Sequence, residues 1–312
     1  MSAGRRRSLA VALTVDALVG DGEAVAWHPV AVAGRALERG CAPLRRLSPA
    51  RQLAGGAAVV AAVAGAAAAG AWAVERLAGR GPAGWVLVGV ALKPAFSLRQ
   101  LLEEGDRVAG ALEAGDLPAA RTRLSSLVSR PTAGLPAGLV ASAAIESLAE
   151  NLADSVVAPL LCFSLFGLPG AAVYRVVNTA DAMIGYRDER VWLGKAAARA
   201  DDALNLVPAR LSVVALAAAA ALLEGGGAGR RALRAAWREA GHTASPNAGW
   251  PMAAMAGALG RRLEKRGHYV LGAAHPEPDA SDVRRARAIV RLAALLAGAA
   301  LCVAPRGRRR RC

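Results

Sequence analysis

Long apolar stretches alternate with charged segments along most of the chain. Residues 53–74 form 22 consecutive positions without a charge, which is long enough for a helix to cross a bilayer. Shorter apolar stretches follow at 82–96, 133–145, 156–173, 204–223 and 292–304. Several of these fall below the roughly 20 residues of a span, so we expect some to be buried or re-entrant. No strand-like alternation of useful length is present, and the pattern predicts an all-α, polytopic membrane helical bundle with polar helical loops.

The polar segments divide the chain without splitting it into separate domains. Residues 97–130 predict two amphipathic helices with a break at 115–118, and residues 174–210 are dense in charge. Residues 224–287 form a basic region, and its opening glycines at 225–229 predict a flexible loop. We therefore expect one membrane domain over residues 1–312, ending in a basic tail at 306–312.

The positive charge is concentrated at the two ends of the chain. Lys and Arg exceed Asp and Glu by 39 − 24 = 15, and eight of these charges are arginines at 5–7, 306 and 308–311. Aromatic residues make up only 4%, so stacking platforms for bases are scarce. This distribution is typical of the cytoplasmic flanks of a multi-pass protein of the cell (inner) membrane, and it argues against nucleic acid as a partner.

One helical face is expected to carry three carboxylates at four-residue intervals: Glu146, Glu150 and Asp154. Asn151 lies beside them, and apolar sequence flanks the group on both sides. Acids in such surroundings are costly unless they meet cations, which a Mg²⁺ carrying phosphates or a substrate amine would supply. The alternative, to which we give equal weight, is a structural role in which these carboxylates form salt bridges with Arg175 or Arg210.

A second group places an amide and a carboxylate on one helical face, because Tyr174, Asn178 and Asp181 follow helical spacing. Arg175 and Arg187 are suited to grip phosphate or carboxylate through paired hydrogen bonds. The alternative is an N-capped surface helix with solvated charges.

A third group combines the adjacent acids Asp201 and Asp202 with Asn205, three residues further on. Such a set suits Mg²⁺ or phosphate. It is also compatible with a simple helix start, where Asp is favoured.

A fourth group contains Ser245 and Asn247 in a loop that precedes an apolar run. Backbone N–H groups ahead of a helix form a natural anion site, and a structural turn and cap is the alternative. The sequence contains no Walker motif, so any ATP site must be of another kind.

Together these groups resemble the CobD/CbiB family of adenosylcobinamide-phosphate synthases, from about residue 9 to about residue 300. The matching motifs are Glu146-Ser-x-x-Glu150-Asn151-x-x-Asp154, Tyr174-Arg175-x-x-Asn178-Thr-x-Asp181-x-x-x-Gly185-Tyr186-Arg187, Arg199-x-Asp201-Asp202-x-x-Asn205-x-x-Pro208-Ala-Arg210 and Ser245-Pro246-Asn247-Ala-Gly249-Trp250-Pro251. The chain departs from the family's usual residues at Gly22, Pro131 and Met252.

The resemblance implies a late step of cobalamin biosynthesis in which ATP drives amide formation. The expected partners are adenosylcobyric acid, aminopropanol or its phosphate, the lipid bilayer and other corrinoid-pathway enzymes, with ATP and Mg²⁺ as cofactors. A non-catalytic membrane platform or a transporter of the same superfamily is the alternative.

On this basis the catalytic candidates are Glu146, Glu150, Asn151, Asp154, Asp181 and Asp202. The substrate- and phosphate-binding candidates are Tyr174, Arg175, Asn178, Arg187, Arg199, Asn205, Arg210, Ser245 and Asn247. The Mg²⁺ candidates are Glu150, Asp154 and Asp201.

Overall fold

The computed structural model describes residues 1–20, 27–184 and 191–303. These residues are almost entirely helical, which confirms the predicted fold class. They gather into two compact units, each assembled from segments that are distant in the sequence. Among the described residues, unit 1 combines 1–20, 27–97, 158–184, 191–204 and 300–303, and unit 2 combines 98–157 and 205–299.

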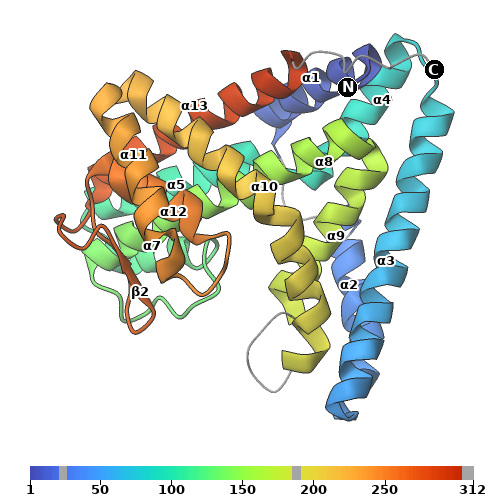
Figure 1. Ribbon diagram of the computed structural model, residues 1–312, viewed down its shortest axis with the longest axis horizontal. Coiled ribbons are helices and arrows are strands. Elements are labelled where there is room, and N and C mark those ends of the chain that lie inside the picture. Colours follow the sequence, from blue (N-terminus) through green and yellow to red (C-terminus); the bar gives the residue numbers. More distant parts are fainter. Residues whose placement is uncertain (21–26, 185–190, 304–312) are drawn as a thin grey trace. The chain divides into compact units, whose positions relative to one another are not determined.

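Unit 1 contains helices that pack through small and branched apolar side chains. Its elements are α1 (Ala3–Val19), α2 (Pro29–Cys41), η1 (Ala42–Arg46), α3 (Pro49–Ala78), α4 (Pro82–Leu92), η2 (Lys93–Ala95), α8 (Ala158–Phe166), α9 (Leu168–Ile184) and the first part of α10 (Val191–Leu223). Helices α2, α3 and α9 lie side by side (Figure 1). Their shared core includes Leu37, Val60, Val177 and Ile184, and Leu193 of α10 joins it.

Unit 2 is built around two helices whose side chains are buried on nearly all sides. Its elements are α5 (Leu98–Glu113), α6 (Leu117–Leu124), α7 (Ala137–Leu152), the π-helical η3 (Ala153–Val157), the rest of α10, α11 (Gly226–Glu239), η4 (Ala240–His242), α12 (Gly249–Leu259), β1 (Leu263–Lys265), β2 (Tyr269–Leu271) and most of α13 (Ala280–Val303). The buried helices are α7 and α12, and both are rich in alanine. Their small side chains let neighbouring helices pack closely on most sides, which fits their central position.

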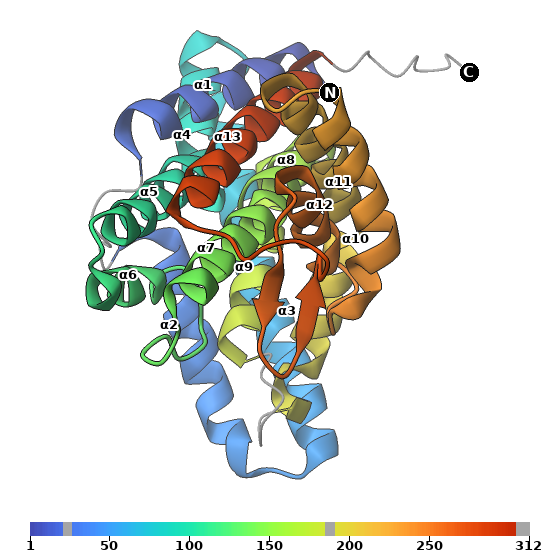
Figure 2. The same cartoon turned by 90° about the vertical axis from the view of Figure 1, so that its left-hand side faces the viewer.

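A small antiparallel hairpin is the feature of unit 2 that the sequence pattern did not reveal. Strands β1 and β2 pair in the register Leu263↔Leu271, Glu264↔Val270 and Lys265↔Tyr269. The hairpin packs beside α7 and α12 (Figure 2). Three residues are too few to establish a period-two pattern, so only the fold reveals these strands.

Five helical stretches are long and apolar enough to cross a membrane. They are Pro49–Ala78, Pro82–Glu113, Ala137–Phe166, Val191–Leu223 and Ala280–Val303. Most of these stretches are longer than the apolar runs in the sequence, because helical structure continues into the flanking polar residues, and an 18-residue apolar window within Ala137–Phe166 is 67% buried. The expectation that some apolar stretches are buried or re-entrant stays a prediction. The structure thus supports a multi-pass membrane protein.

Two further boundaries differ from the sequence-based expectation. The apolar stretch 156–173 is divided at Gly167, whose φ of 78° is a left-handed conformation that favours glycine and separates α8 from α9. The glycines after residue 224 were expected to form a loop, whereas α11 already begins at Gly226. The predicted pair of amphipathic helices over 97–130 is confirmed as α5 and α6, and Asp116 caps the second by accepting from the Ala119 amide at 2.9 Å.

The close approach of α1 and α4 leads to a first prediction. A Cβ added at Gly89 would lie 2.7 Å from both the Ser8 carbonyl oxygen and Val11 Cγ1. We expect Gly89→Ala to destabilise the protein by about 1–3 kcal/mol, the usual cost of overpacking. Gly65→Ala is the matched control, because nothing lies within 4 Å of its added Cβ, and we expect it to be neutral or slightly stabilising. Denaturant unfolding in detergent, followed by circular dichroism, measures both; equal effects would contradict the prediction.

Candidate functional site

A buried carboxylate on α7 is the centre of a hydrogen-bond network in unit 2. Glu146 accepts hydrogen bonds from the Ser142 hydroxyl at 2.7 Å and from the Tyr269 hydroxyl at 2.8 Å. It also forms an ion pair with Arg130 at 3.3 Å, and only 7% of its side chain is exposed. The charge of Glu146 is therefore balanced inside the protein, as a buried carboxylate requires.

The partners of Glu146 differ from those that the sequence suggested. The alternative hypothesis of a salt-bridged helix face named Arg175 or Arg210, whereas the ion pair is with Arg130. The pKa of Tyr269 is raised, mainly by burial and to a smaller extent by the negative charge of Glu146, so its hydroxyl stays protonated and donates a hydrogen bond. Sequence reasoning missed both Arg130 and Tyr269 as site residues. The sequence contained one hint of Arg130, because the next residue, Pro131, departs from the family's usual residue at that position. It contained no hint of Tyr269.

A small cavity of about 150 Å³ opens beside this network. It is lined by Arg130, Glu146, Ser147, Glu150 and Tyr269, and Lys265 of the hairpin completes its polar wall. Two acids and two cations thus border a space that is large enough for a small polar group. The predicted pairing of Glu146 with Glu150 on one helical face is confirmed by their shared cavity.

The other two residues of this motif lie further along the same helix. Asn151 donates to the Ser147 carbonyl oxygen at 3.0 Å and to the Ser147 hydroxyl oxygen at 3.1 Å, and it accepts from Ser155 at 3.0 Å. Asp154 lies in the π-helical η3, whose wider turns interrupt the four-residue spacing. Such π segments inside α-helices are frequent at functional sites.

In unit 1, the second and third motifs meet through a chain of polar contacts. Arg175 donates to Asn178 Oδ1 at 3.2 Å, and Asn178 Nδ2 donates to Asp201 Oδ1 at 3.2 Å. Arg175 is also anchored to the Ala95 carbonyl oxygen at 2.9 Å. Helical spacing within α9 predicted that Asn178 and Asp181 share a face, whereas the contacts join Asn178 to Arg175 of the same helix and to Asp201 of α10.

Three acids come together at this place. Burial, followed by the negative charges of Asp201 and Asp202, raises the pKa of Asp181 to about 6. The helix-start interpretation of Asp201 and Asp202 was wrong, since both lie well inside α10. The surface-helix interpretation of α9 was also wrong, because Tyr174 is 1% exposed and packs with Ala158 and Cys162.

The raised pKa of Asp181 has a consequence for stability. An acid whose pKa rises on folding destabilises the folded state increasingly as pH rises from about 4 to about 6, and this cost persists at higher pH. We expect Asp181→Asn to raise stability at pH 8 by roughly 1–2 kcal/mol, allowing for screening by solvent, and to converge with the wild type below pH 4. Unfolding temperatures at pH 4, 6 and 8 measure this. Glu38→Gln, which removes an exposed acid of unit 1, should give no gain at pH 8; a matching gain would contradict the prediction.

Three remaining candidates from this part of the chain occupy different environments. Arg199 is exposed to solvent, whereas Asn205 is almost fully buried within α10. Arg187 lies outside the residues that the structure describes, together with Gly185 and Tyr186. Arg199 and Asn205 therefore stay predictions of substrate contact.

The loop before α12 brings two predicted phosphate-binding residues together in unit 2. Arg210 donates to Asn247 Oδ1 at 2.6 Å and to the Pro246 carbonyl oxygen at 3.2 Å. Its guanidinium also lies over the Trp250 ring, 4.6 Å from the ring centre. The Ser245 hydroxyl oxygen accepts from the amides of Asn247 and Ala248, both at 3.2 Å. These two amides are thus used in a structural turn, which was the alternative interpretation of this loop.

The acids of the described residues do not form an all-protein metal cage. No group of three or more His, Cys, Asp or Glu side chains within residues 1–20, 27–184 and 191–303 is placed to hold a metal ion. Mg²⁺ that arrives with nucleotide phosphates needs only one or two carboxylates from the protein. Asp181, whose pKa is raised by burial and by the negative charges of Asp201 and Asp202, fits that requirement together with these two acids. The expected Mg²⁺ set of Glu150, Asp154 and Asp201 draws on both units and stays a prediction.

The chain is similar to proteins named for cobalamin biosynthesis, over 60% to 93% of its length for three such relatives. The "Cobalamin biosynthesis protein CobD" of Dehalococcoides mccartyi (strain CBDB1) is 47% identical over 187 residues, which cover 60% of this chain and 60% of that protein. The protein of the same name from Sinorhizobium sp is 40% identical over 263 residues, 82% of this chain and 81% of the relative. The "Probable cobalamin biosynthesis protein CobD" of Methanothrix thermoacetophila (strain DSM 6194 / JCM 14653 / NBRC 101360 / PT) is 36% identical over 305 residues, 93% of each.

No solved structure matches this chain. The match to the family described as CobD/Cbib protein extends over residues 9–296, which includes every described residue of the three polar clusters above. With this match and the similarity to the Methanothrix protein over 93% of both lengths, the chain belongs to the CobD/Cbib protein family.

Proposed function

We propose that this protein acts in cobalamin biosynthesis as a multi-pass enzyme of the cell membrane, joining adenosylcobyric acid to aminopropanol or its phosphate at the expense of ATP. The main support is the cavity in unit 2, where Glu150 and the buried Glu146 face Arg130 and Lys265. This cavity is built on the motif that carries the family resemblance, and it offers both signs of charge to a small polar substrate.

The reaction needs an activated carboxyl group and a neutral amine. The corrinoid carboxylate attacks the γ-phosphate of ATP, which forms an acyl phosphate and releases ADP. The amine nitrogen then attacks the acyl carbon, the bond to phosphate breaks, and the amine gives up a proton. We assign acceptance of that proton to Glu150, while Arg130 and Lys265 hold the anionic carboxyl group and stabilise the negative charge that develops on its oxygen.

We assign the phosphates to the basic groups of the other motifs. Arg175, which is held by the Ala95 carbonyl oxygen and Asn178, is oriented to bind an anion, and Arg210 is similarly fixed by Asn247. Mg²⁺ would neutralise phosphate charge, and Asp181 with Asp201 and Asp202 would hold it. The corrinoid, the amine and the bilayer are thus the proposed partners, with other corrinoid-pathway enzymes nearby and no role for nucleic acid.

A reconstitution assay tests this proposal. The full chain in lipid nanodiscs is incubated with adenosylcobyric acid, aminopropanol phosphate and Mg-ATP, and the products are analysed by mass spectrometry. We expect adenosylcobinamide phosphate and ADP in equal amounts, and neither product when ATP is omitted. A folded protein that yields no amide product would overturn the ligase proposal.

The non-catalytic platform makes a different prediction about Asp154. If corrinoid production in cells continues unaltered with Asp154→Asn, while removal of the whole protein abolishes it, the protein acts as an assembly platform. A loss of production with the variant present at normal levels in the membrane supports the enzyme.

A further inference from the structure

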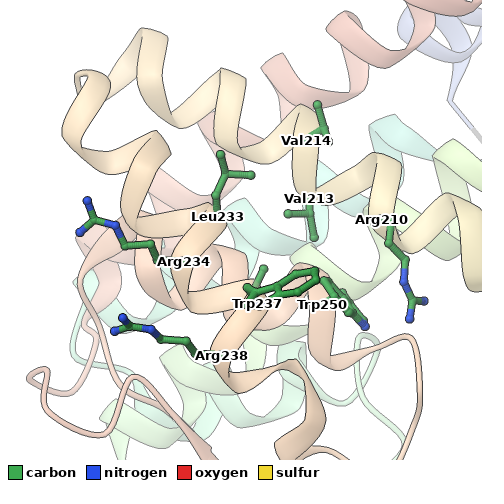
Figure 3. Close-up of a pocket in the computed structure, with 9 residues that line it drawn as sticks. Arg210, Val213, Val214, Leu233, Arg234, Trp237, Arg238 and Trp250 are labelled. Atoms are coloured by element: carbon green, nitrogen blue, oxygen red, sulfur yellow. The ribbon is translucent and has the colours of Figure 1, made fainter.

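A groove of about 640 Å³ lies on unit 2 between α10, α11 and the start of α12, apart from the Glu146 cavity (Figure 3). Its apolar wall includes Val213 and Val214 of α10, Leu233 and Trp237 of α11, and Trp250 of α12. The two indole rings meet edge to face, with centres 6.1 Å apart. Trp237 is 81% exposed and Val214 is 61% exposed, so a large apolar surface is open at this place.

Arginines surround this apolar wall. Arg210, Arg234 and Arg238 line the groove, and its nine lining residues include no acid. Arg210 is occupied by Asn247 and the Trp250 ring. Figure 3 shows the guanidinium groups of Arg234 and Arg238 at the edge, pointing away from the two tryptophans. Within the part of the chain that the structure describes, neither makes an ion pair, so their charges remain available for an anion.

Helix α11 presents these residues as one continuous stripe. Arg230, Leu233, Arg234, Trp237 and Arg238 are all exposed, and their spacing of three and four residues places them on one face. The opposite face packs against α12. A helix face that alternates arginine with Leu and Trp is typical of helices that lie in the interface of an anionic membrane.

We propose that this groove binds an anionic phospholipid, with Arg234 and Arg238 on the headgroup phosphate and an acyl chain along Val213, Val214, Leu233 and Trp237. The apolar wall belongs in part to α10, one of the five membrane-length helices, so acyl chains are its natural neighbours. A nucleotide or free phosphate would satisfy the arginines but leave the open apolar surface in contact with water, at an unfavourable free energy. The groove shares Arg210 with the proposed phosphate-binding residues, but the lipid proposal rests on Arg234 and Arg238, to which the ligase proposal assigns no role.

Native mass spectrometry of the detergent-purified full chain tests the proposal. The protein is loaded with equal amounts of dioleoyl phosphatidylglycerol and dioleoyl phosphatidylcholine, and retained lipid is counted. We expect preferential retention of one phosphatidylglycerol. Arg234→Gln and Arg238→Gln should each weaken retention roughly fivefold, the contribution expected of one arginine near an anionic headgroup.

Arg230→Gln is the matched control, since it removes the same charge from the same exposed helix face outside the groove. We expect it to retain phosphatidylglycerol as the wild type does, and unfolding temperatures confirm that all variants are folded. Trp237→Ala should lower retention of the lipid without changing the charge. Equal loss with Arg230→Gln, equal retention of phosphatidylcholine, or displacement of the lipid by millimolar inorganic phosphate would overturn the proposal.

Discussion

Replacement of Glu146 by alanine is expected to destabilise the protein by about 3–5 kcal/mol. The change removes the carboxylate that balances Arg130, whose side chain is only 18% exposed, and it also deprives the Ser142 and Tyr269 hydroxyls of their acceptor. A buried charge that loses its partner cannot regain full hydration, which is why breaking such a pair costs more than the pair itself contributes. Denaturant unfolding of the purified protein in detergent measures the loss.

Two further variants separate this effect from a general sensitivity of α7. The double variant Glu146→Leu, Arg130→Met replaces both charges by apolar groups, and we expect it to recover most of the lost stability. Glu103→Ala breaks the exposed pair with Arg99 on α5 and should cost less than about 1 kcal/mol. If Glu146→Ala costs no more than Glu103→Ala, the network around Glu146 does not contribute as described.

Replacement of Glu150 by glutamine is expected to lower ligation at least a hundredfold while the fold stays intact. Glutamine keeps the size of the side chain in the cavity but removes its negative charge and its capacity to accept the amine proton. A positioned general base typically contributes about 10²–10⁴ to the rate. The rate of adenosylcobinamide phosphate formation by the nanodisc-bound protein, at saturating substrates, measures the effect.

Glu103→Gln is the control for this second prediction, because it removes an exposed acid of the same unit. It should leave the rate unchanged. Full activity of Glu150→Gln would exclude Glu150 as the proton acceptor.

Much of the local architecture was predictable, because helix formation depends on residues that are close in the sequence. The apolar run at 53–74 lies within α3, and the break near Gly115 separates α5 from α6. The second motif was likewise expected on a helix, and its described residues lie on α9. The ends of the helices were less predictable. The five membrane-length stretches extend into polar residues, which a hydropathy pattern assigns to the segments outside the membrane.

The sequence by itself thus determined the helical class, the membrane character and the family motifs, all of which are encoded in local composition and short spacings. Only the tertiary structure decided which charges meet. Arg130 lies 16 residues from Glu146, and Tyr269 lies 123 residues from it on a hairpin too short to leave a pattern. Such pairings arise from packing between elements rather than from propensities along the chain. Buried charges must be balanced wherever the fold brings them together, so their partners are fixed by geometry that no local pattern records.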